Sequence, residues 1–202
     1  GLFTTIQLGI LAIVAGLILG LILALLKLYA HKAVRIIVKA YIDVFRSILL
    51  LVLLIIIFYA LPFVGISLSP FYAAAVALTV VSGAYTAEIF RAGIEAIPKG
   101  QFEASEALGL SYKDMMVDVI LPQAIKVVIP PLTNNCINVI KDTALASVVA
   151  MPDLLKQATQ AQAVAANPTP LIAAAVIYLA FLLPLVLWVS GLEKKFKAGD
   201  TQ

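Results

Sequence analysis

The sequence predicts an all-helical integral membrane protein with five transmembrane helices, an external N-terminus and a cytoplasmic C-terminus. Of its 202 residues, 63% are hydrophobic and only 12% are charged. A soluble domain is about half apolar and a quarter charged, so this composition favours a lipid environment. The apolar residues fall in long runs, and the basic residues cluster between them. We therefore expect residues 1–202 to form one transmembrane domain.

Five apolar runs define the expected spans, because a helix needs about 20 apolar residues to cross the hydrocarbon core. The first run lacks a preceding basic residue and is too long for a signal peptide, so we interpret it as a span. Gly16 and Gly20 within it have the spacing that lets two membrane helices approach closely. Pro130 and Pro131 are expected to bend or break the fourth run. The predicted spans are residues 2–28, 47–64, 70–90, 121–149 and 170–192.

The basic residues predict the orientation of these spans. Of the 14 Lys and Arg residues, all but Lys141 and Lys156 fall on one side if the N-terminus is outside. Cytoplasmic loops carry such an excess of positive charge. The basic, amphipathic stretch 30–46 is expected to lie along the cytoplasmic interface, and 151–167 to form a short external helix. Residues 98–120, between the third and fourth spans, are then cytoplasmic.

Residues 98–120 are polar in a chain that is otherwise apolar. Apolar residues recur there at helical spacing, and Gly109 is expected to end a first helix in the left-handed conformation. Ser111 and Asp114 have the spacing of an N-terminal capping box for a second helix, which Leu121-Pro122 is expected to end. On spacing alone, an ordinary solvated helical loop explains these features as well as a docking site does.

One motif in this segment is more specific. It begins with Glu103-Ala104-Ser105, continues after three residues with Gly109, and ends after nine more with Val119-Ile120-Leu121-Pro122. This pattern resembles the EAA loop of the membrane subunits of type I ABC importers. Ser105 replaces an Ala of that pattern, and Val119 replaces an Ile. The flanking residues 87–101 and 121–143 resemble polar amino-acid uptake permeases of the histidine, glutamine and arginine type. The resemblance is concentrated in residues 85–150.

This resemblance implies a transport subunit that is not itself an enzyme. The chain has no phosphate-binding loop, so it is expected to bind no cofactor, with ATP and Mg²⁺ held by a separate ATPase. The implied partners are two ATPase copies, a second identical or homologous permease, an external solute-binding protein and an amino acid, in a bacterial or archaeal cell membrane. One His and one Cys predict no metal site, and nucleic acid is not expected. The resemblance assigns ATPase coupling to Glu103, Ala104, Ser105, Gly109, Leu121 and Pro122.

Polar residues at membrane depth are costly, so they usually face a cavity. Asn134, Asn138 and Asp142 follow at four-residue steps and should share one helical face. Acids and amides together suit a basic amino acid, whereas amides alone suit glutamine. The candidate substrate-path residues are Tyr85, Thr86, Glu88, Asn134, Asn135, Asn138 and Asp142.

Structural roles for the same residues stay open. The Asn side chains would also join helices by hydrogen bonds. Glu88 would form a gate or a structural ion pair with Arg91 or Arg46, and Asp142 would pair with Lys141 or with a substrate amine.

Three other functions also remain open. An ATP-independent channel or secondary carrier would leave the cytoplasmic segment without a role. An ABC permease for a non-amino-acid solute would share the EAA loop, and a membrane scaffold would transport nothing. ATP-dependence of uptake, or co-purification with an ATPase, separates the first rival from the importer.

Overall fold

The computed structural model describes residues 1–198, and their side chains up to residue 191; these residues contain helices and connecting turns only, which confirms the all-helical class. The helices differ widely in length and are joined by short connections. The α-helices are α1 (Leu2–Tyr29), α2 (Lys32–Ser47), α3 (Leu50–Ile55), α4 (Pro70–Glu95), α5 (Lys99–Ala107), α6 (Tyr112–Asp114), α7 (Leu121–Asp142), α8 (Leu154–Ala165) and α9 (Thr169–Ala198). Two π-helical and two 3₁₀ segments complete them: η1 (Ile56–Ala60), η2 (Leu61–Val64), η3 (Met115–Ile120) and η4 (Thr143–Val149).

Four helical stretches of the described residues are long and apolar enough to cross a membrane: Leu2–Tyr29, Pro70–Glu95, Tyr112–Val149 and Thr169–Gly191. The expected second span, 47–64, is shorter, because its helix begins only at Leu50. It reaches spanning length only together with α2, from which it is bent by 102°. Extended backbone at Ile48 and Leu49 produces this bend. The structure thus has four candidate spans, or five if the bent pair counts as one.

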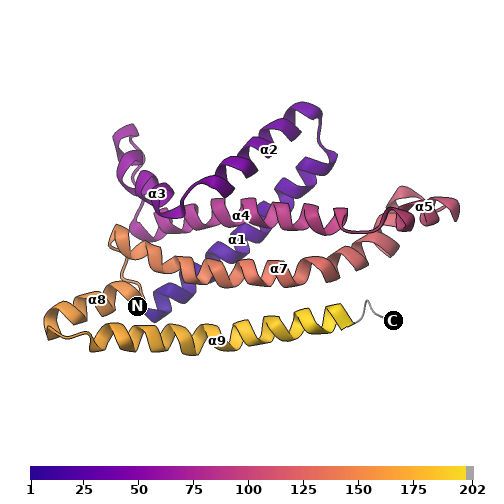
Figure 1. Ribbon diagram of the computed structural model, residues 1–202. Helices are drawn as coiled ribbons and strands as arrows, with labels where there is room; N and C mark the ends of the chain where they lie inside the picture. The colour runs from indigo at the N-terminus through magenta and orange to yellow at the C-terminus, as the bar shows by residue number, and fades with distance from the viewer. Residues whose placement is uncertain (199–202) are drawn as a thin grey trace.

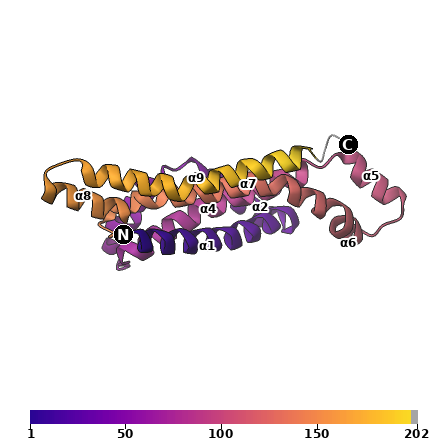
Figure 2. The same ribbon diagram turned by 90° about the horizontal axis from the view of Figure 1, so that it is seen from below.

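The long helices lie side by side, with the connecting helices at opposite ends. α4, α7 and α9 run alongside one another, and α1 crosses α4 at an angle (Figure 1). The N-terminus and α8 lie at one end of this bundle. α5 and α6 extend beyond the other end, as the view from below shows most clearly (Figure 2). The arrangement therefore separates the segment expected to be cytoplasmic from the helix expected to be external.

The crossing of α1 and α4 depends on two glycines. A Cβ atom placed on Gly16 would lie 2.7 Å from Ser82 Oγ, and one placed on Gly20 would overlap the side chain of Thr86. Only hydrogen fits at these two positions, which confirms the close approach expected from their spacing.

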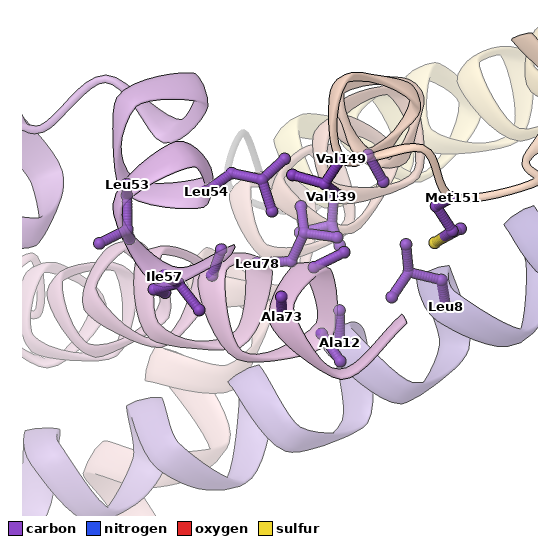
Figure 3. Packing of buried hydrophobic residues seen from close by; sticks show 14 residues of the cluster. Leu8, Ala12, Leu53, Leu54, Ile57, Ala73, Leu78, Val139, Val149 and Met151 are labelled. Atoms are coloured by element: carbon purple, nitrogen blue, oxygen red, sulfur yellow. The ribbon is translucent and has the colours of Figure 1, made fainter. Parts of the chain in front are cut away.

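A buried apolar cluster joins α1, α3, α4 and α7 near the end that holds the N-terminus (Figure 3). Small side chains from α4, such as Ala73, pack against larger ones from the neighbouring helices. The residues labelled in Figure 3 are Leu8, Ala12, Leu53, Leu54, Ile57, Ala73, Leu78, Val139, Val149 and Met151.

The prolines disturb the helices less than the sequence predicted. The helix does not end at Leu121-Pro122: the stretch 112–149 is helical throughout. In the π-helical turn before Pro122, the Leu121 N–H bonds to the carbonyl of Met116. The same device precedes Pro62, where the Leu61 N–H bonds to Ile56. A wider turn accommodates a residue that lacks an N–H, so the helix continues.

Pro130 and Pro131 also lie inside the continuous helix α7, so of the expected bend or break, the break was wrong. Tertiary packing against neighbouring helices tolerates prolines in such helices.

Candidate functional site

A polar cavity of about 270 Å³ opens between α3, α4 and α7. Ligand pockets for small molecules are commonly about 300–1,000 Å³, so this cavity lies just below the usual range. Apolar walls come from Leu50, Leu78, Val81 and Val139. The polar lining residues are Ser82, Tyr85, Asn135, Asn138 and Asp142. Four of these five residues are substrate-path candidates from the sequence; the fifth, Ser82, is a weaker candidate, because a serine hydroxyl can bond its own helix backbone.

Asn135 both lines the cavity and joins α7 to α4. Its amide nitrogen donates to Ser82 Oγ at 3.3 Å and to Thr86 Oγ1 at 3.2 Å. Thr86 is fully buried in this contact and is not among the residues that line the cavity. Ser82 and Thr86 are also the residues that pack against Gly16 and Gly20 of α1. The three helices α1, α4 and α7 therefore meet at these two side chains.

Asp142 and Asn138 lie one turn apart on α7 and both line the cavity. Asp142 is half-buried and Asn138 is exposed. Neither Asn134 nor Lys141, both exposed, is among the lining residues. Within the described part of the chain, Asp142 makes no ion pair, so Lys141 does not neutralise it directly. The cavity thus presents a carboxylate beside amide and hydroxyl groups.

Glu88 belongs to a separate charged cluster rather than to the polar cavity. Its carboxylate pairs with Lys27 at 3.2 Å, with Arg46 at 3.8 Å and with Arg91, whose Nε donates at 3.0 Å. Arg91 also pairs with Glu95. We call Glu88 and its three cations the Glu88 cluster. Both expected partners, Arg91 and Arg46, are present, and Lys27 of α1 is a third that the sequence did not indicate.

Arg46 and Tyr85 connect the Glu88 cluster to the polar cavity. The Tyr85 hydroxyl donates to the Arg46 carbonyl at 3.1 Å, and the Arg46 guanidinium lies 5.5 Å from the Tyr85 ring centre. Such a cation over an aromatic face is electrostatically attracted. Tyr85 also lines the polar cavity. A movement of Arg46 would therefore affect both the cavity wall and the ion pairs of Glu88.

We call residues 98–120 the coupling segment, after the role that the sequence resemblance implies for them. They form a small apolar core with the adjoining ends of α4 and α7. Ile97, Met115, Met116, Ile120 and Ala124 are buried there, with Phe102, Ile94 and Val119 partly buried against them. Ser105 is also buried, and its hydroxyl donates to the Gln101 carbonyl at 2.7 Å.

Two local signals determine the corner of this segment. Gly109 has φ +75°, a left-handed conformation that favours glycine. Ser111 Oγ accepts from the Asp114 N–H at 3.2 Å, which caps the next helix. Both features confirm the sequence prediction. Leu121 and Pro122 are exposed at the start of α7, on the helix that continues from this segment.

The outer surface of the coupling segment is exposed and partly apolar. Glu103 and Ala104 are exposed on α5. Leu108 is 79% exposed, Tyr112 59% and Val117 52%.

Three features of the site could not be found in the sequence. Lys27 lies 61 residues from Glu88, and Ser82 lies 53 residues from Asn135. A serine in a membrane helix usually bonds its own backbone, so its type alone carries little signal. The apolar walls of the cavity also depend on helix packing. In the described residues, no group of three His, Cys, Asp or Glu side chains could hold a metal.

Comparison with known proteins gives consistent matches. The family described as binding-protein-dependent transport system inner membrane component matches residues 16–198. The arginine transport system permease protein ArtQ of Bacillus subtilis is 40% identical over 99% of this chain and 92% of its own length. The putative glutamine transport system permease protein GlnP of Rickettsia bellii is 40% identical over 96% of this chain and 90% of its own.

A solved structure described as an amino acid ABC transporter with histidines superposes with a TM-score of 0.91. It is 38% identical, over 96% of this chain and 92% of that one.

Proposed function

This chain belongs to the family of binding-protein-dependent transport system inner membrane components, and we propose on that premise how it carries its substrate and receives its driving force. It is a permease subunit of an ABC importer, a transport subunit of the bacterial inner membrane that crosses it several times. The proposal concerns the substrate path, the membrane topology, the partners and the coupling segment.

We propose that the polar cavity is the substrate site and that it accepts a polar amino acid. The observation that carries this proposal is the single carboxylate, Asp142, set beside the amides of Asn135 and Asn138. An amino acid carries an ammonium and a carboxylate: Asp142 would pair with a cationic group, and the Asn138 amide would donate to the carboxylate, because both N–H groups of Asn135 already bond to Ser82 and Thr86. Relatives are named for arginine and for glutamine.

A basic amino acid such as arginine is the first candidate. Its side chain supplies a second cation, which matches an Asp142 carboxylate that makes no ion pair within the described residues. Glutamine is the second candidate, because the remaining lining residues Ser82, Tyr85, Asn135 and Asn138 are neutral hydrogen-bonding groups. In both cases Glu88 acts outside the cavity, where it holds α1, α2 and α4 together as a gate.

We propose five crossings, with the bent pair of α2 and α3–η2 forming the second. The N-terminus and α8 would then be external, and the coupling segment cytoplasmic. Support comes from their opposite positions along the bundle (Figure 2) and from the basic residues near the end of α1. A separate ATPase would dock on the exposed surface around Glu103, Ala104 and Gly109.

The complete importer would contain two ATPases, a second permease and an external binding protein. Only 11% of the apolar stretch of α9 is buried against the rest of the described chain, which leaves a large face for lipid or a second permease. The coupling segment would relay the movement of the ATPase into α4 and α7, which it connects directly.

An uptake panel tests this function. Proteoliposomes containing the chain with its co-purified partners would be loaded with ATP and given labelled arginine, lysine, histidine and glutamine. We expect ATP-dependent uptake, with the KM for arginine raised about tenfold or more by Asp142→Asn, because a charge-assisted contact is lost. Glutamine uptake should change less. Asp43→Asn, an exposed carboxylate on α2, serves as the matched control.

Uptake that continues without ATP would instead support a channel or secondary carrier. An unchanged KM for every substrate in Asp142→Asn would remove the polar cavity from the substrate path.

A further inference from the structure

A second pocket, of about 400 Å³, lies where the end of α1, the first half of α2 and the end of α4 meet. It is distinct from the polar cavity, with which it shares no lining residue. Lys32, Arg35, Ile36 and Lys39 recur at steps of three and four, so one face of α2 forms one wall. The amino-acid path assigns no role to this pocket.

Cations dominate the lining of this basic pocket. Five of its eight lining residues are basic: Lys27, Lys32, Arg35, Lys39 and Arg91. The one acidic lining residue, Glu95, is paired with Arg91. Glu88, which is not a lining residue, is shared by Lys27 and Arg91. Five cations therefore face two carboxylates, and the excess of positive charge is concentrated on α2.

The three α2 cations that line the pocket have no carboxylate partner among the described residues. The Arg35 guanidinium donates to the carbonyls of Leu28 and Ala30, at 3.4 and 3.2 Å. Within the described residues, Lys32 and Lys39 have no carboxylate within ion-pair distance. Three like charges on one helical face repel one another and destabilise the helix. A bound anion would reduce this repulsion.

Two further features fit an anion of a particular kind. The first turn of α2 has no acidic residue, and His31 makes no side-chain cap, so the positive end of the helix dipole lies beside the pocket at Lys32. Leu28 and Ile36 supply apolar lining, and Ile36 is 60% exposed. Arginine and lysine around an apolar wall suit a phosphate group that is attached to hydrocarbon.

We propose that this basic pocket binds a phosphate group, provided by the headgroup of an anionic lipid or by free phosphate. Arg35, Lys32 and Lys39 contact the phosphate oxygens. The bound anion also attracts Lys27 and Arg91, and so it competes with Glu88 for both. Because α4 leads from this pocket into the coupling segment through Ala96–Pro98, occupancy would loosen the Glu88 cluster at the base of that segment. This inference is independent of which amino acid is carried.

Native mass spectrometry of the chain, purified in mild detergent with its bound partners, tests the proposal. The protein is incubated with phosphatidylglycerol or with phosphatidylcholine of identical acyl chains. We expect preferential retention of phosphatidylglycerol. The double variant Lys32→Gln/Lys39→Gln should lower this retention on the order of tenfold or more, since each basic residue near a membrane surface contributes to anionic-lipid binding. Lys113→Gln/Lys126→Gln removes two exposed cations outside the pocket and should leave the retention unchanged.

A second arm separates the two sources of phosphate. The thermal unfolding midpoint is measured with inorganic phosphate and with chloride at equal ionic strength, without added lipid. Lipid retention that phosphate does not displace identifies a headgroup site. A phosphate-specific rise in the midpoint, lost in Lys32→Gln/Lys39→Gln, identifies free phosphate. The proposal is overturned if neither response occurs, or if the control pair lowers the response as much as the pocket pair.

Discussion

The crossing of α1, α4 and α7 and the coupling segment are stabilised in different ways. At the crossing, glycines allow helices from distant parts of the chain to touch, and Asn135 links them by hydrogen bonds. In the coupling segment, a positive-φ glycine, an N-cap and an apolar core all come from residues 94–124. Changes at the crossing should therefore alter stability, whereas changes on the exposed surface of the coupling segment should alter function.

The largest stability effect is expected at Gly20. In Gly20→Ala, the new methyl group overlaps Thr86 and separates α1 from α4, at a cost of about 2 kcal/mol or more for overpacking. Gly191→Ala is the matched control, because a Cβ there meets no atom within 4 Å. The thermal unfolding midpoint in detergent should fall for Gly20→Ala alone. Equal midpoints for the two variants would contradict the close crossing.

Glu88→Gln is expected to cost about 2 kcal/mol, because three cations lose a shared and mostly buried carboxylate. Glu95→Gln should cost under about 0.5 kcal/mol, since Glu95 is 58% exposed and, among the described residues, pairs with Arg91 alone. Chemical denaturation of both variants at low and high salt measures the difference. Equal losses would show that the Glu88 cluster does not hold α1, α2 and α4 together.

Gly109→Ala tests the coupling segment. A non-glycine residue in the left-handed conformation costs about 1 kcal/mol, and no neighbouring atom adds a clash. Gly100→Ala, in helix α5, is the control and should be neutral or slightly stabilising. Limited proteolysis of the segment should be faster in Gly109→Ala, with the rest of the chain unchanged. Unfolding of the whole bundle in this variant would contradict a locally stabilised segment.

The smallest effect is expected at Asp153, the N-cap of α8. Asp153 is fully buried, and its Oδ1 accepts from the Lys156 N–H at 2.8 Å. Burial raises the pKa of this carboxyl, against the lowering effect of backbone N–H groups. A raised pKa means that the folded state favours the protonated form. The protonated Asp153 carboxyl therefore contributes fully to the stability of the folded state below the unfolded pKa of about 3.9. This contribution is lost as pH rises through the pKa of the folded state.

Asp153→Asn keeps the cap but cannot ionise. Its unfolding midpoint relative to the parent protein should therefore rise as pH increases from 4 to 7, by a few degrees at most. Asp118→Asn, an exposed carboxylate of the coupling segment, should show no such trend. A variant that loses stability relative to the parent as pH rises would mean that the ionised carboxylate is favoured.

The two regions also differ in how far the sequence predicted them. Gly109 and Ser111 act on their immediate neighbours, so their residue types and spacing were sufficient. The partners Lys27 of Glu88 and Ser82 of Asn135 come from distant helices, and only tertiary packing brings them together. Pro122 shows that a local signal can also mislead. A proline predicts the end of a helix, yet a π-helical turn before it lets the helix continue. Gly16 and Gly20 lie between these cases, because their spacing indicated a close approach but not the partner helix.

The ratio of amino acid taken up to ATP hydrolysed is the most direct test of the coupling segment as the relay. It would be measured in proteoliposomes containing Glu103→Lys or Gly109→Ala, with unchanged amounts of assembled complex confirmed by co-purification. We predict that ATP hydrolysis continues while uptake per ATP falls about tenfold or more, as expected when a mechanical contact worth over about 1.4 kcal/mol is lost. A ratio equal to that of the parent protein in both variants would contradict the account.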